Sequence, residues 1–214
     1  MLEVAALEVN IGTANILREV NLSVPDGSMC GLIGRNGAGK TTLIRSVMGL
    51  SQVRSGSILF DRQELLDMQA YRRARLGIGF MPEDRGLVPN FTTEDNLLVP
   101  AWAAKIGQAE ERLAWIYKLM PEVEAFAKRR ANQLSGGQQK MVALARALMC
   151  GTKLLLLDEP FEGLAPVLAR RVAEVLSNLK REGLSILVAE SNEKHVADML
   201  DHINIIERGS IQSG

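Results

Sequence analysis

Apolar and polar positions alternate near the start of the chain and then give way to short apolar runs. Residues 2–10 and 16–24 carry apolar side chains at or near every second position, with a turn signal at Gly12 between them. This pattern is typical of strands. The runs at 29–33 and 78–81 are apolar throughout, which is typical of strands that are buried on both faces.

Helical spacing dominates the middle of the chain, and strands and helices alternate in its last third. From about residue 94 to residue 130 the pattern is helical, with a core-facing stripe of Leu113, Ile116, Tyr117 and Met120. Further helices are expected at about 40–49, 71–75, 136–149, 166–183 and 193–200, and further strands at 57–60, 154–157, 185–189 and 203–207. Apolar strands alternating with helices predict an α/β fold with a parallel sheet and a helical insertion at about 85–135.

Composition and charge narrow the class of this 214-residue chain. Hydrophobic residues make up 47% and charged residues 23%, as in an ordinary soluble globular protein. With 25 Lys and Arg against 25 Asp and Glu, and 4% aromatic residues, the chain matches neither a general basic nucleic-acid binder nor a base-stacking platform. Cys30 and Cys150 lie in apolar runs and are expected to be buried thiols in a reducing compartment. Because no stretch is long enough to span a membrane and no secretion signal begins the chain, we expect a soluble, cytoplasmic protein whose membrane role comes through a partner.

The strongest motif is a glycine-rich loop between an expected strand and an expected helix. It satisfies the pattern G-x-x-x-x-G-K-[ST] and comprises Gly34, Arg35, Asn36, Gly37, Ala38, Gly39, Lys40, Thr41 and Thr42. The glycines let successive backbone N–H groups point at one centre, and the helix N-terminus adds partial positive charge. A chance match is expected in on the order of one random chain in a hundred. We therefore predict a phosphate-binding loop in which Lys40 reaches the β- and γ-phosphates and the Thr41 hydroxyl binds Mg²⁺.

Two carboxylates follow the apolar strand expected at 154–157. Asp158 and Glu159 come at its C-terminal end, and ligand sites in parallel sheets lie at that edge. Two acids after a strand are often only the start of a loop, but the phosphate loop in the same sheet favours a functional role. We expect Asp158 to hold Mg²⁺, directly or through water, and Glu159 to polarise the water that attacks the γ-phosphate.

A second anion site is expected at the start of the helix that precedes this strand. Ser135 is a good N-cap within the segment 134–140, and Gly136 and Gly137 expose backbone N–H groups. One nucleotide does not obviously need two such sites on one chain. We therefore expect a dimer in which each phosphate loop is completed by the other subunit's Ser135 helix.

Together, these three motifs resemble those of the ATP-binding subunit of ABC transporters. The phosphate loop, the Leu-Ser-Gly-Gly-Gln signature and the Leu-Leu-Leu-Leu-Asp-Glu-Pro strand occur in that family's order and approximate spacing, over essentially the whole chain. The resemblance implies one nucleotide-binding domain, residues 1–214, with a RecA-like α/β P-loop NTPase core, an N-terminal antiparallel β portion and a helical subdomain. It also implies ATP and Mg²⁺ as cofactors and Glu159 as the catalytic base. The signature residues expected to close over the partner's γ-phosphate are Ser135, Gly136, Gly137 and Gln138.

Residues 80–89 and 159–166 resemble, within that family, the second of two paralogous ATPases of high-affinity branched-chain amino-acid importers. The implied function is ATP hydrolysis that powers the import of hydrophobic amino acids, at the cytoplasmic face of the inner membrane. Implied partners are permease subunits, a paralogous ATPase or a second copy of this chain, and indirectly an external substrate-binding protein; no nucleic acid is expected. The same group includes ATPases for urea or short-chain amides, so the substrate and the composition of the dimer stay open.

Three positions depart from the general pattern of that family. No aromatic residue precedes the phosphate loop to stack on adenine, and Ile11 stands near that place, which predicts weaker adenine discrimination. Glu83 stands where glutamine is usual, and we expect it to bind Mg²⁺ and its loop to contact the permease. Ser191 stands at the switch position usually held by histidine, which predicts a slow site. His195 lies one helical turn later and is not its equivalent.

Two further departures concern the segment 162–165 and the end of the chain. Residues 162–165 lack the aspartate that the family usually carries there. Family members usually continue past the last expected strand with a further strand and a helix, whereas this chain ends at residues 211–214. We therefore expect the C-terminal end to be truncated.

Three other classes of protein remain as alternatives. An exporter-type ABC ATPase normally keeps the switch histidine that this chain lacks. A soluble ABC protein acting on ribosomes or DNA usually carries two cassettes or long coiled-coil arms, which one cassette of neutral charge does not match. A simple P-loop kinase would leave the signature at 134–140 unexplained.

Overall fold

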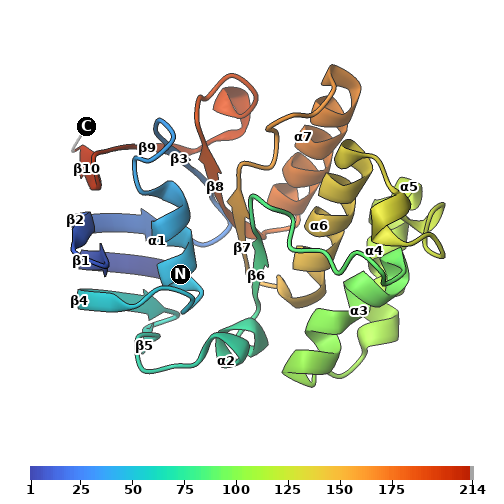
Figure 1. Ribbon diagram of the computed structural model, residues 1–214, viewed down its shortest axis with the longest axis horizontal. Helices are drawn as coiled ribbons and strands as arrows, with labels where there is room; N and C mark the ends of the chain where they lie inside the picture. Colours follow the sequence, from blue (N-terminus) through green and yellow to red (C-terminus); the bar gives the residue numbers. More distant parts are fainter. Residues whose placement is uncertain (213–214) are drawn as a thin grey trace.

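The computed structural model describes residues 1–212, which form two sheets with helices between and beside them (Figure 1). The first sheet is antiparallel, with the strand order β2-β1-β4-β5. Its strands are β1 (Leu2–Ile11), β2 (Ala14–Val24), β4 (Val53–Phe60) and β5 (Gln63–Glu64). Buried and exposed side chains alternate along much of β1 and β2, because one face of this sheet meets the core. The antiparallel portion expected at the N-terminus is therefore present.

The second sheet is parallel except at one edge, with the strand order β10-β9-β3-β8-β7-β6. Its strands are β3 (Met29–Ile33), β6 (Ile78–Met81), β7 (Leu154–Asp158), β8 (Ser185–Glu190), β9 (His202–Glu207) and the antiparallel β10 (Ser210–Gln212). All side chains of β7 and β8 are buried, as expected for strands covered on both faces. Ile33 pairs with Glu190 and Asp158 pairs with Ala189, so the C-terminal ends of β3, β7 and β8 meet at one edge.

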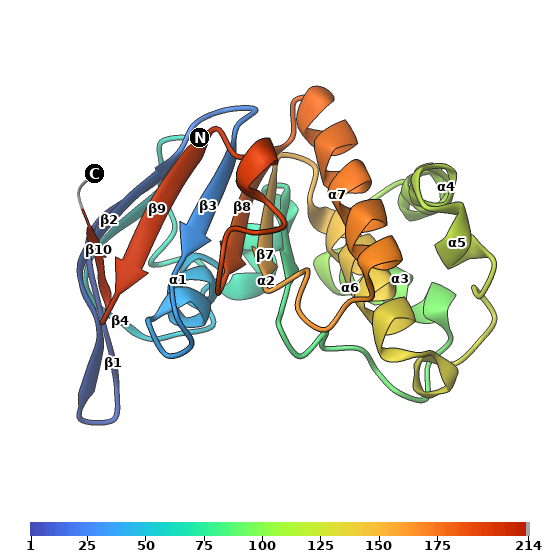
Figure 2. The same cartoon turned by 90° about the horizontal axis from the view of Figure 1, so that it is seen from above.

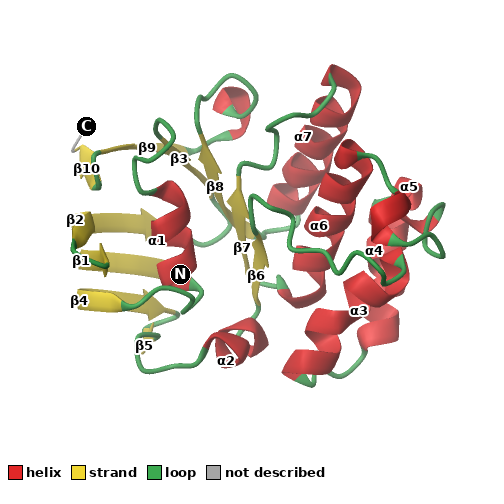
Figure 3. Cartoon of the chain, in the orientation of Figure 1, coloured by secondary structure: helices red, strands yellow, loops and turns green. Residues whose placement is uncertain are grey.

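Helices cover both faces of the parallel sheet, as Figure 2 shows from above and Figure 3 shows by secondary structure. α1 (Lys40–Val47) lies between the two sheets, and α6 (Gly136–Cys150) and α7 (Pro166–Arg181) lie on the opposite face. A helical layer beyond α6 contains α3 (Thr93–Ala104), α4 (Ala109–Leu119) and α5 (Pro121–Glu124). The short elements are α2 (Ala70–Arg75), η1 (Ala131–Gln133) and η2 (Ala197–Met199).

Two hydrophobic clusters follow from this layering. One lies between the antiparallel sheet, α1 and one face of the parallel sheet, and Leu43 of α1 belongs to it. The other lies between the opposite face of the parallel sheet and the helices α3 to α7. Of the stripe predicted in the middle of the chain, Ile116 and Met120 are fully buried in this second cluster, and Leu113 and Tyr117 pack against it. Apolar burial on both faces therefore fixes the sheet edge from which the glycine-rich and acidic loops emerge.

The structure confirms the predicted α/β fold with its parallel core and helical subdomain, but one predicted helix was wrong. At 193–200 only the 3₁₀ turn η2 forms. Of that segment only Val196 is fully buried, and the Asp201 N–H already donates to the Met29 carbonyl at 2.8 Å, where β9 begins beside β3. With one buried apolar side chain, the segment has no amphipathic face to pack against the sheet, and most helical stability in proteins comes from such packing. The strand β10 was not predicted, and residues 213–214, at the end expected to be truncated, lie outside the described residues.

The two cysteines behave as buried structural residues. Cys30 and Cys150 are free, as the sequence predicted. Burial raises the pKa of both thiols, to about 11 for Cys150, so they stay protonated and poorly reactive. Within residues 1–212, no helix combines the length and apolar character needed to cross a bilayer.

Candidate functional site

The glycine-rich loop joins β3 to α1 at the C-terminal edge of the parallel sheet. Gly37 and Gly39 have φ angles of 80° and 113°, which residues with a Cβ rarely adopt. A Cβ at Gly39 would also lie 2.8 Å from Leu17 Cδ2. Gly39 is the N-cap of α1 and offers no side chain to the first backbone N–H groups of the helix, and the residues from Gly39 to Thr42 line a pocket. Such a helix start is suited to binding an anion.

Lys40 is buried beside the carboxylate of Glu159. Its Nζ atom lies 3.0 Å from Glu159 Oε1, and the two side chains are 5% and 6% exposed. The same Nζ donates to the Gly34 carbonyl at 2.6 Å. Two buried charges offset their desolvation only when they are well paired and hydrogen-bonded, which is the case here. The structure therefore brings Lys40 of the loop and Glu159 of the acidic strand end into direct contact.

Ser191 joins the same contact from the end of β8. Its Oγ lies 2.6 Å from Glu159 Oε1 and 2.7 Å from Asn36 Oδ1, and its N–H donates to Glu159 Oε2 at 3.2 Å. The hydroxyl has one hydrogen, so it can donate to only one of the two oxygens at a time. His195 lies elsewhere: its exposed side chain stacks on Phe161, with ring centroids 5.8 Å apart. The structure thus places Ser191, and not His195, at the expected switch position.

Glu159 reaches the site from a strained turn. Its φ angle of 50° lies in the left-handed region, which costs a residue with a Cβ roughly 1 kcal/mol. Burial alone would raise its pKa, but hydrogen bonds from Ser191, Glu190 and Lys40 hold the pKa below its ordinary value. The carboxylate is therefore ionised near neutral pH, as a proton acceptor must be.

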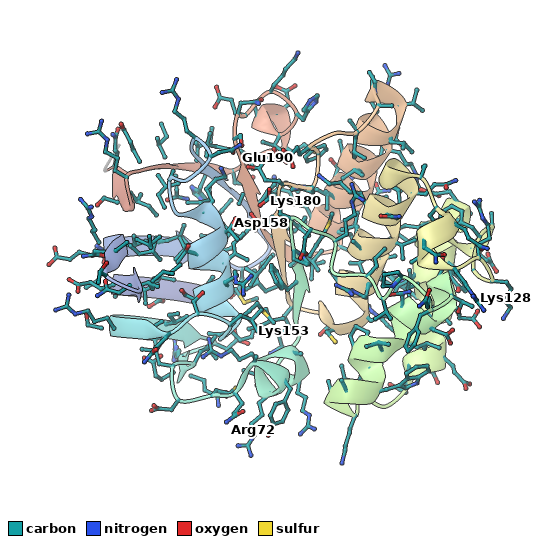
Figure 4. All side chains as sticks on the ribbon, in the orientation of Figure 1. Arg72, Lys128, Lys153, Asp158, Lys180 and Glu190 are labelled. Atoms are coloured by element: carbon teal, nitrogen blue, oxygen red, sulfur yellow. The ribbon has the colours of Figure 1, made fainter. Side chains whose placement is uncertain are left out.

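Glu190 lies beside Glu159 and was not predicted from the sequence. The side chain is buried at the end of β8, and its Oε1 accepts a hydrogen bond from the Phe161 N–H at 3.0 Å. Burial, followed by the neighbouring Glu159, raises the pKa of Glu190 to about 8. Glu190 therefore keeps its proton near neutral pH and can donate it in a hydrogen bond to Glu159. Figure 4 labels Asp158 and Glu190 near the centre of the molecule.

Asp158 is fully buried, and within residues 1–212 neither of its carboxylate oxygens has a hydrogen-bond partner. Burial raises its pKa to about 6. A pocket of 350 Å³ is lined by Asp158 together with Thr41, Glu83 and Glu162. An unpaired buried carboxylate is costly, and a cation in this pocket would satisfy it. Hydroxyl and carboxylate oxygens are ligands that Mg²⁺ prefers, so these residues fit a magnesium ion.

Protein ligands alone do not complete such a metal site. Among the described residues, no group of three or more His, Cys, Asp or Glu side chains is placed to hold a metal. Mg²⁺ usually keeps several waters and binds through one or two carboxylates plus substrate phosphates. A magnesium ion in this pocket would therefore need further oxygen ligands from water or from a phosphate-bearing ligand.

A second pocket, of 420 Å³, lies over the glycine-rich loop and shares Thr41 and Glu83 with the first. Lys40 and Glu159 line it from one side, and Ile11 lines it from the end of β1. Ile11 is 59% exposed, which leaves its apolar surface open to a ligand. A larger hollow of 850 Å³ between β4 and α2 contains none of these residues.

The signature residues lie outside both pockets. Ser135 and Gln138 form a capping box at the start of α6: the Gln138 N–H donates to Ser135 Oγ at 3.3 Å, and the Ser135 N–H donates to Gln138 Oε1 at 3.0 Å. Ser135 and Gly136 are exposed, and none of the residues from Ser135 to Gly137 lines a pocket over the loop. The structure therefore does not bring the signature to the chain's own phosphate loop. It leaves an exposed helix start that another molecule can approach.

Two cations of α6, the buried Lys140 and the half-buried Arg146, hold the loops that carry the acidic residues. Lys140 donates to backbone carbonyls of the loop that begins at Glu159, and Arg146 donates to backbone carbonyls of the loop that follows Glu83. Neither role was predicted from the sequence. The available signal was a charged residue at an apolar, core-facing position of a helix.

Comparison with known sequences identifies the relatives of this chain. A family model described as ABC transporter matches residues 17–162. The high-affinity branched-chain amino acid transport ATP-binding protein BraG of Pseudomonas aeruginosa is 34% identical over 211 residues, covering 99% of this chain and 91% of BraG. The probable branched-chain amino acid transport ATP-binding protein LivF of Archaeoglobus fulgidus is 31% identical, covering 99% and 90%. The lipopolysaccharide export system ATP-binding protein LptB of Escherichia coli K12 is 31% identical, covering 92% and 82%.

Solved structures show the same arrangement. A dimeric bacterial ABC transporter cassette superposes with a TM-score of 0.89 at 25% identity, covering 100% of this chain and 97% of the cassette. The ADP-bound form of another ATP-binding cassette gives a TM-score of 0.85 at 26% identity, covering 100% and 89%. The fold, the glycine-rich loop and the similarity to these structures all indicate the same ATP-binding cassette fold.

Proposed function

This chain belongs to the ABC transporter family, and we propose that it powers the import of branched-chain amino acids through a membrane permease. As a member of that family it is an ATP-hydrolysing subunit of a transporter. The observation that carries the proposal is the meeting of Lys40, Asp158 and Glu159 at one edge of the parallel sheet. The substrate class is supported by the similarity to BraG and LivF, both of which are named as branched-chain amino acid transport proteins.

The phosphates of ATP are assigned to the loop of residues 34–42. The open N–H groups at the start of α1 supply donors, and the Lys40 ammonium supplies positive charge. Thr41, Asp158 and Glu83 would hold Mg²⁺, and the unpaired oxygens of Asp158 support that assignment. Bound there, the ion would neutralise charge on the phosphates of the nucleotide.

Glu159 is assigned the role of catalytic base. It is ionised, buried and oriented by Ser191, and it would accept the proton of the water that attacks the γ-phosphate. In the structure it is paired with Lys40, so phosphate binding to Lys40 would free the carboxylate for this role. A serine hydroxyl carries no positive charge, and we therefore expect turnover to be slow.

The signature residues Ser135, Gly136, Gly137 and Gln138 are assigned to the γ-phosphate of a nucleotide on a second ATPase subunit. Their exposure in this chain, and the dimeric form of a related cassette, support this assignment. That subunit would be a second copy of this chain or a paralogue. The pair would lie at the cytoplasmic face of the inner membrane against permease subunits, with an external binding protein delivering the substrate.

Two other transport functions compete with this one. One is the import of urea or short-chain amides, because the same group includes ATPases for those substrates. An exporter-type function is favoured by the 31% identity to LptB. Co-purification distinguishes these functions: the C-terminally tagged chain is extracted gently from native membranes, and the proteins that accompany it are identified.

A multi-span permease together with a second, histidine-bearing ATPase is the expected result, and transport assays on that permease then identify the substrate. Recovery with a lipopolysaccharide export permease would show that the chain serves export and would overturn the import proposal. Recovery only from the soluble fraction, with ribosomal or DNA-bound partners, would overturn the transport function and leave the ATP chemistry intact.

A further inference from the structure

Lys140 is a buried cation on an otherwise apolar stretch of α6. It is 3% exposed, and the helix residues after it, Met141, Val142 and Ala143, belong to the hydrophobic core. Burial lowers the pKa of Lys140, and the nearby carboxylates Glu162 and Glu190 oppose that effect. A buried ammonium group lowers stability unless its hydrogen bonds are satisfied, so the partners of this lysine are informative.

Those partners are two backbone carbonyls of one turn. Lys140 Nζ donates to the carbonyl of Glu159 at 2.5 Å and to the carbonyl of Glu162 at 2.6 Å. The Glu162 N–H also donates to the Glu159 carbonyl, at 3.3 Å, and so closes the turn. The ammonium group therefore binds both ends of the segment that begins with the catalytic base.

The same turn is held on its other side by β8. The Glu159 N–H donates to the Ala189 carbonyl at 2.9 Å, and the Phe161 N–H donates to Glu190 Oε1 at 3.0 Å. Because Glu159 has a positive φ of 50°, its backbone needs outside contacts to stay in this conformation. β8 supplies two of these contacts, and Lys140 supplies the contacts from α6.

We propose that Lys140 is a positioning residue, which fixes the Glu159 carboxylate by tying its turn to the helix that begins with the signature. The inference rests on the proposed function, because it assigns a role toward the catalytic base. Lys140 lies five positions after Ser135 on one continuous helix, a rise of about 7.5 Å. A shift of the helix start against a nucleotide on the other subunit therefore reaches the Glu159 turn through a rigid element. Lys140 therefore links closure of the signature over the other subunit's nucleotide to the alignment of Glu159 in this chain's own site.

The test replaces Lys140 in the full chain and separates kcat from KM. Lys140→Met keeps the volume and removes the donor, and kcat is expected to fall about tenfold to a hundredfold, as for small misplacements of a reacting group. KM and the affinity for ATP are expected to stay within about twofold, because the phosphate loop is untouched. Lys140→Gln keeps N–H donors without the charge. Its kcat is expected to lie between those of wild type and Lys140→Met, about threefold below wild type.

Lys180→Met is the matched control. Lys180 also donates to a backbone carbonyl, that of Met199 at 3.0 Å, and to Asp201 at 2.6 Å, but near the opposite edge of the sheet. This variant is expected to lower the melting temperature and to leave kcat within about twofold of wild type.

Four results would overturn the proposal. They are a wild-type kcat for Lys140→Met, a parallel loss of kcat and ATP affinity, equal kcat values for the Met and Gln variants, and an equal fall of kcat in Lys180→Met. If Lys140→Met does not fold, the Gln variant decides: a wild-type kcat overturns the proposal, and a reduced kcat at unchanged KM supports it. A wild-type chain that binds ATP without hydrolysing it would overturn the proposed function as well, and it is recognised before any variant is made.

Discussion

Lys40 Nζ and Glu159 Oε1 lie 3.0 Å apart in a buried ion pair. Lys40 is assigned to the phosphates of ATP and Glu159 to the attacking water. While the two side chains are paired with each other, neither is free for its assigned partner. An incoming phosphate must compete with the Glu159 carboxylate for the lysine. Nucleotide binding and release of the base are thereby coupled.

This competition predicts that Glu159→Gln strengthens ATP binding while it abolishes turnover. A neutral amide competes less for Lys40, so ATP affinity is expected to rise about fivefold to tenfold, or roughly 1 kcal/mol. Hydrolysis is expected to fall at least about a hundredfold because the proton acceptor is lost. Calorimetric titration and phosphate release measure the two effects. Glu193→Gln, at an exposed position, is the control, and weaker ATP binding by Glu159→Gln would contradict the competition.

The unpaired carboxylate of Asp158 predicts a stability that depends on pH and on Mg²⁺. Its pKa is raised from 3.8 to about 6, so the folded chain without metal loses stability as pH rises through that interval. Asp158→Asn removes this loss and is expected to raise the melting temperature in EDTA at about pH 8 by roughly 3 °C. With Mg²⁺ and ATP the order reverses, because only wild type gains a metal ligand. If the variant is stabilised by Mg²⁺ and ATP as strongly as wild type, Asp158 is not a ligand.

The hydroxyl of Ser191 predicts a shift in the pH–rate profile. Its hydrogen bond to Glu159 lowers the pKa of that carboxyl, so Ser191→Ala is expected to move the acidic limb of the kcat profile to higher pH. The loss of rate should be larger at about pH 6 than at about pH 8, roughly tenfold against threefold. ATP affinity is expected to change little. An equal loss at both pH values would show that the hydroxyl does not act on the base.

Glu190 predicts a second pH dependence, of stability in the absence of nucleotide. Its pKa is raised from 4.5 to about 8, so between these values the folded state holds a proton that the unfolded state has released. Stability therefore falls as pH rises through this range. Glu190→Gln mimics the protonated acid and lacks this slope, so its melting temperature in EDTA should exceed that of wild type by roughly 5 °C at about pH 8.5 and differ little at about pH 5. Parallel melting curves would contradict a shifted pKa.

The exposed side chain of Ile11 predicts weak recognition of the adenine ring of ATP. Ile11 lines the pocket over the loop, and an aliphatic side chain cannot stack as an aromatic ring does. Wild type is expected to bind ATP and GTP within about fivefold of each other, and Ile11→Tyr is expected to strengthen ATP binding by about threefold to tenfold. Competition with a fluorescent nucleotide measures both. Strong discrimination by wild type would mean that other residues recognise adenine.

The phosphate loop could be predicted from the sequence because its conformation is set locally. Gly37, Gly39 and Lys40 are close in the chain, and each has a physical reason to stand where it does. The strands β7 and β8 were equally clear, since they are apolar and buried at nearly every position.

Contacts between distant segments could not be predicted in this way. Ser191 was identified by its position, but its contact with Asn36 joins residues 155 positions apart. Glu190 and Lys140 depend on burial against the Glu159 turn, and no pattern within their own segments shows that turn. The helix expected at 193–200 was wrong for a related reason, because pairing of β9 with β3 determines where that segment must end.

The residues assigned to the phosphates, to Mg²⁺ and to the attacking water lie where the parallel strands end, and the opposite edge of that sheet is free of them. The turn at Glu182 and Gly183, which leads into β8, is exposed at that opposite edge. Insertions are tolerated best at exposed turns that carry no buried hydrogen bonds. A fluorophore or an affinity label attached at Glu182 would therefore follow the subunit through assembly and turnover without touching the chemistry.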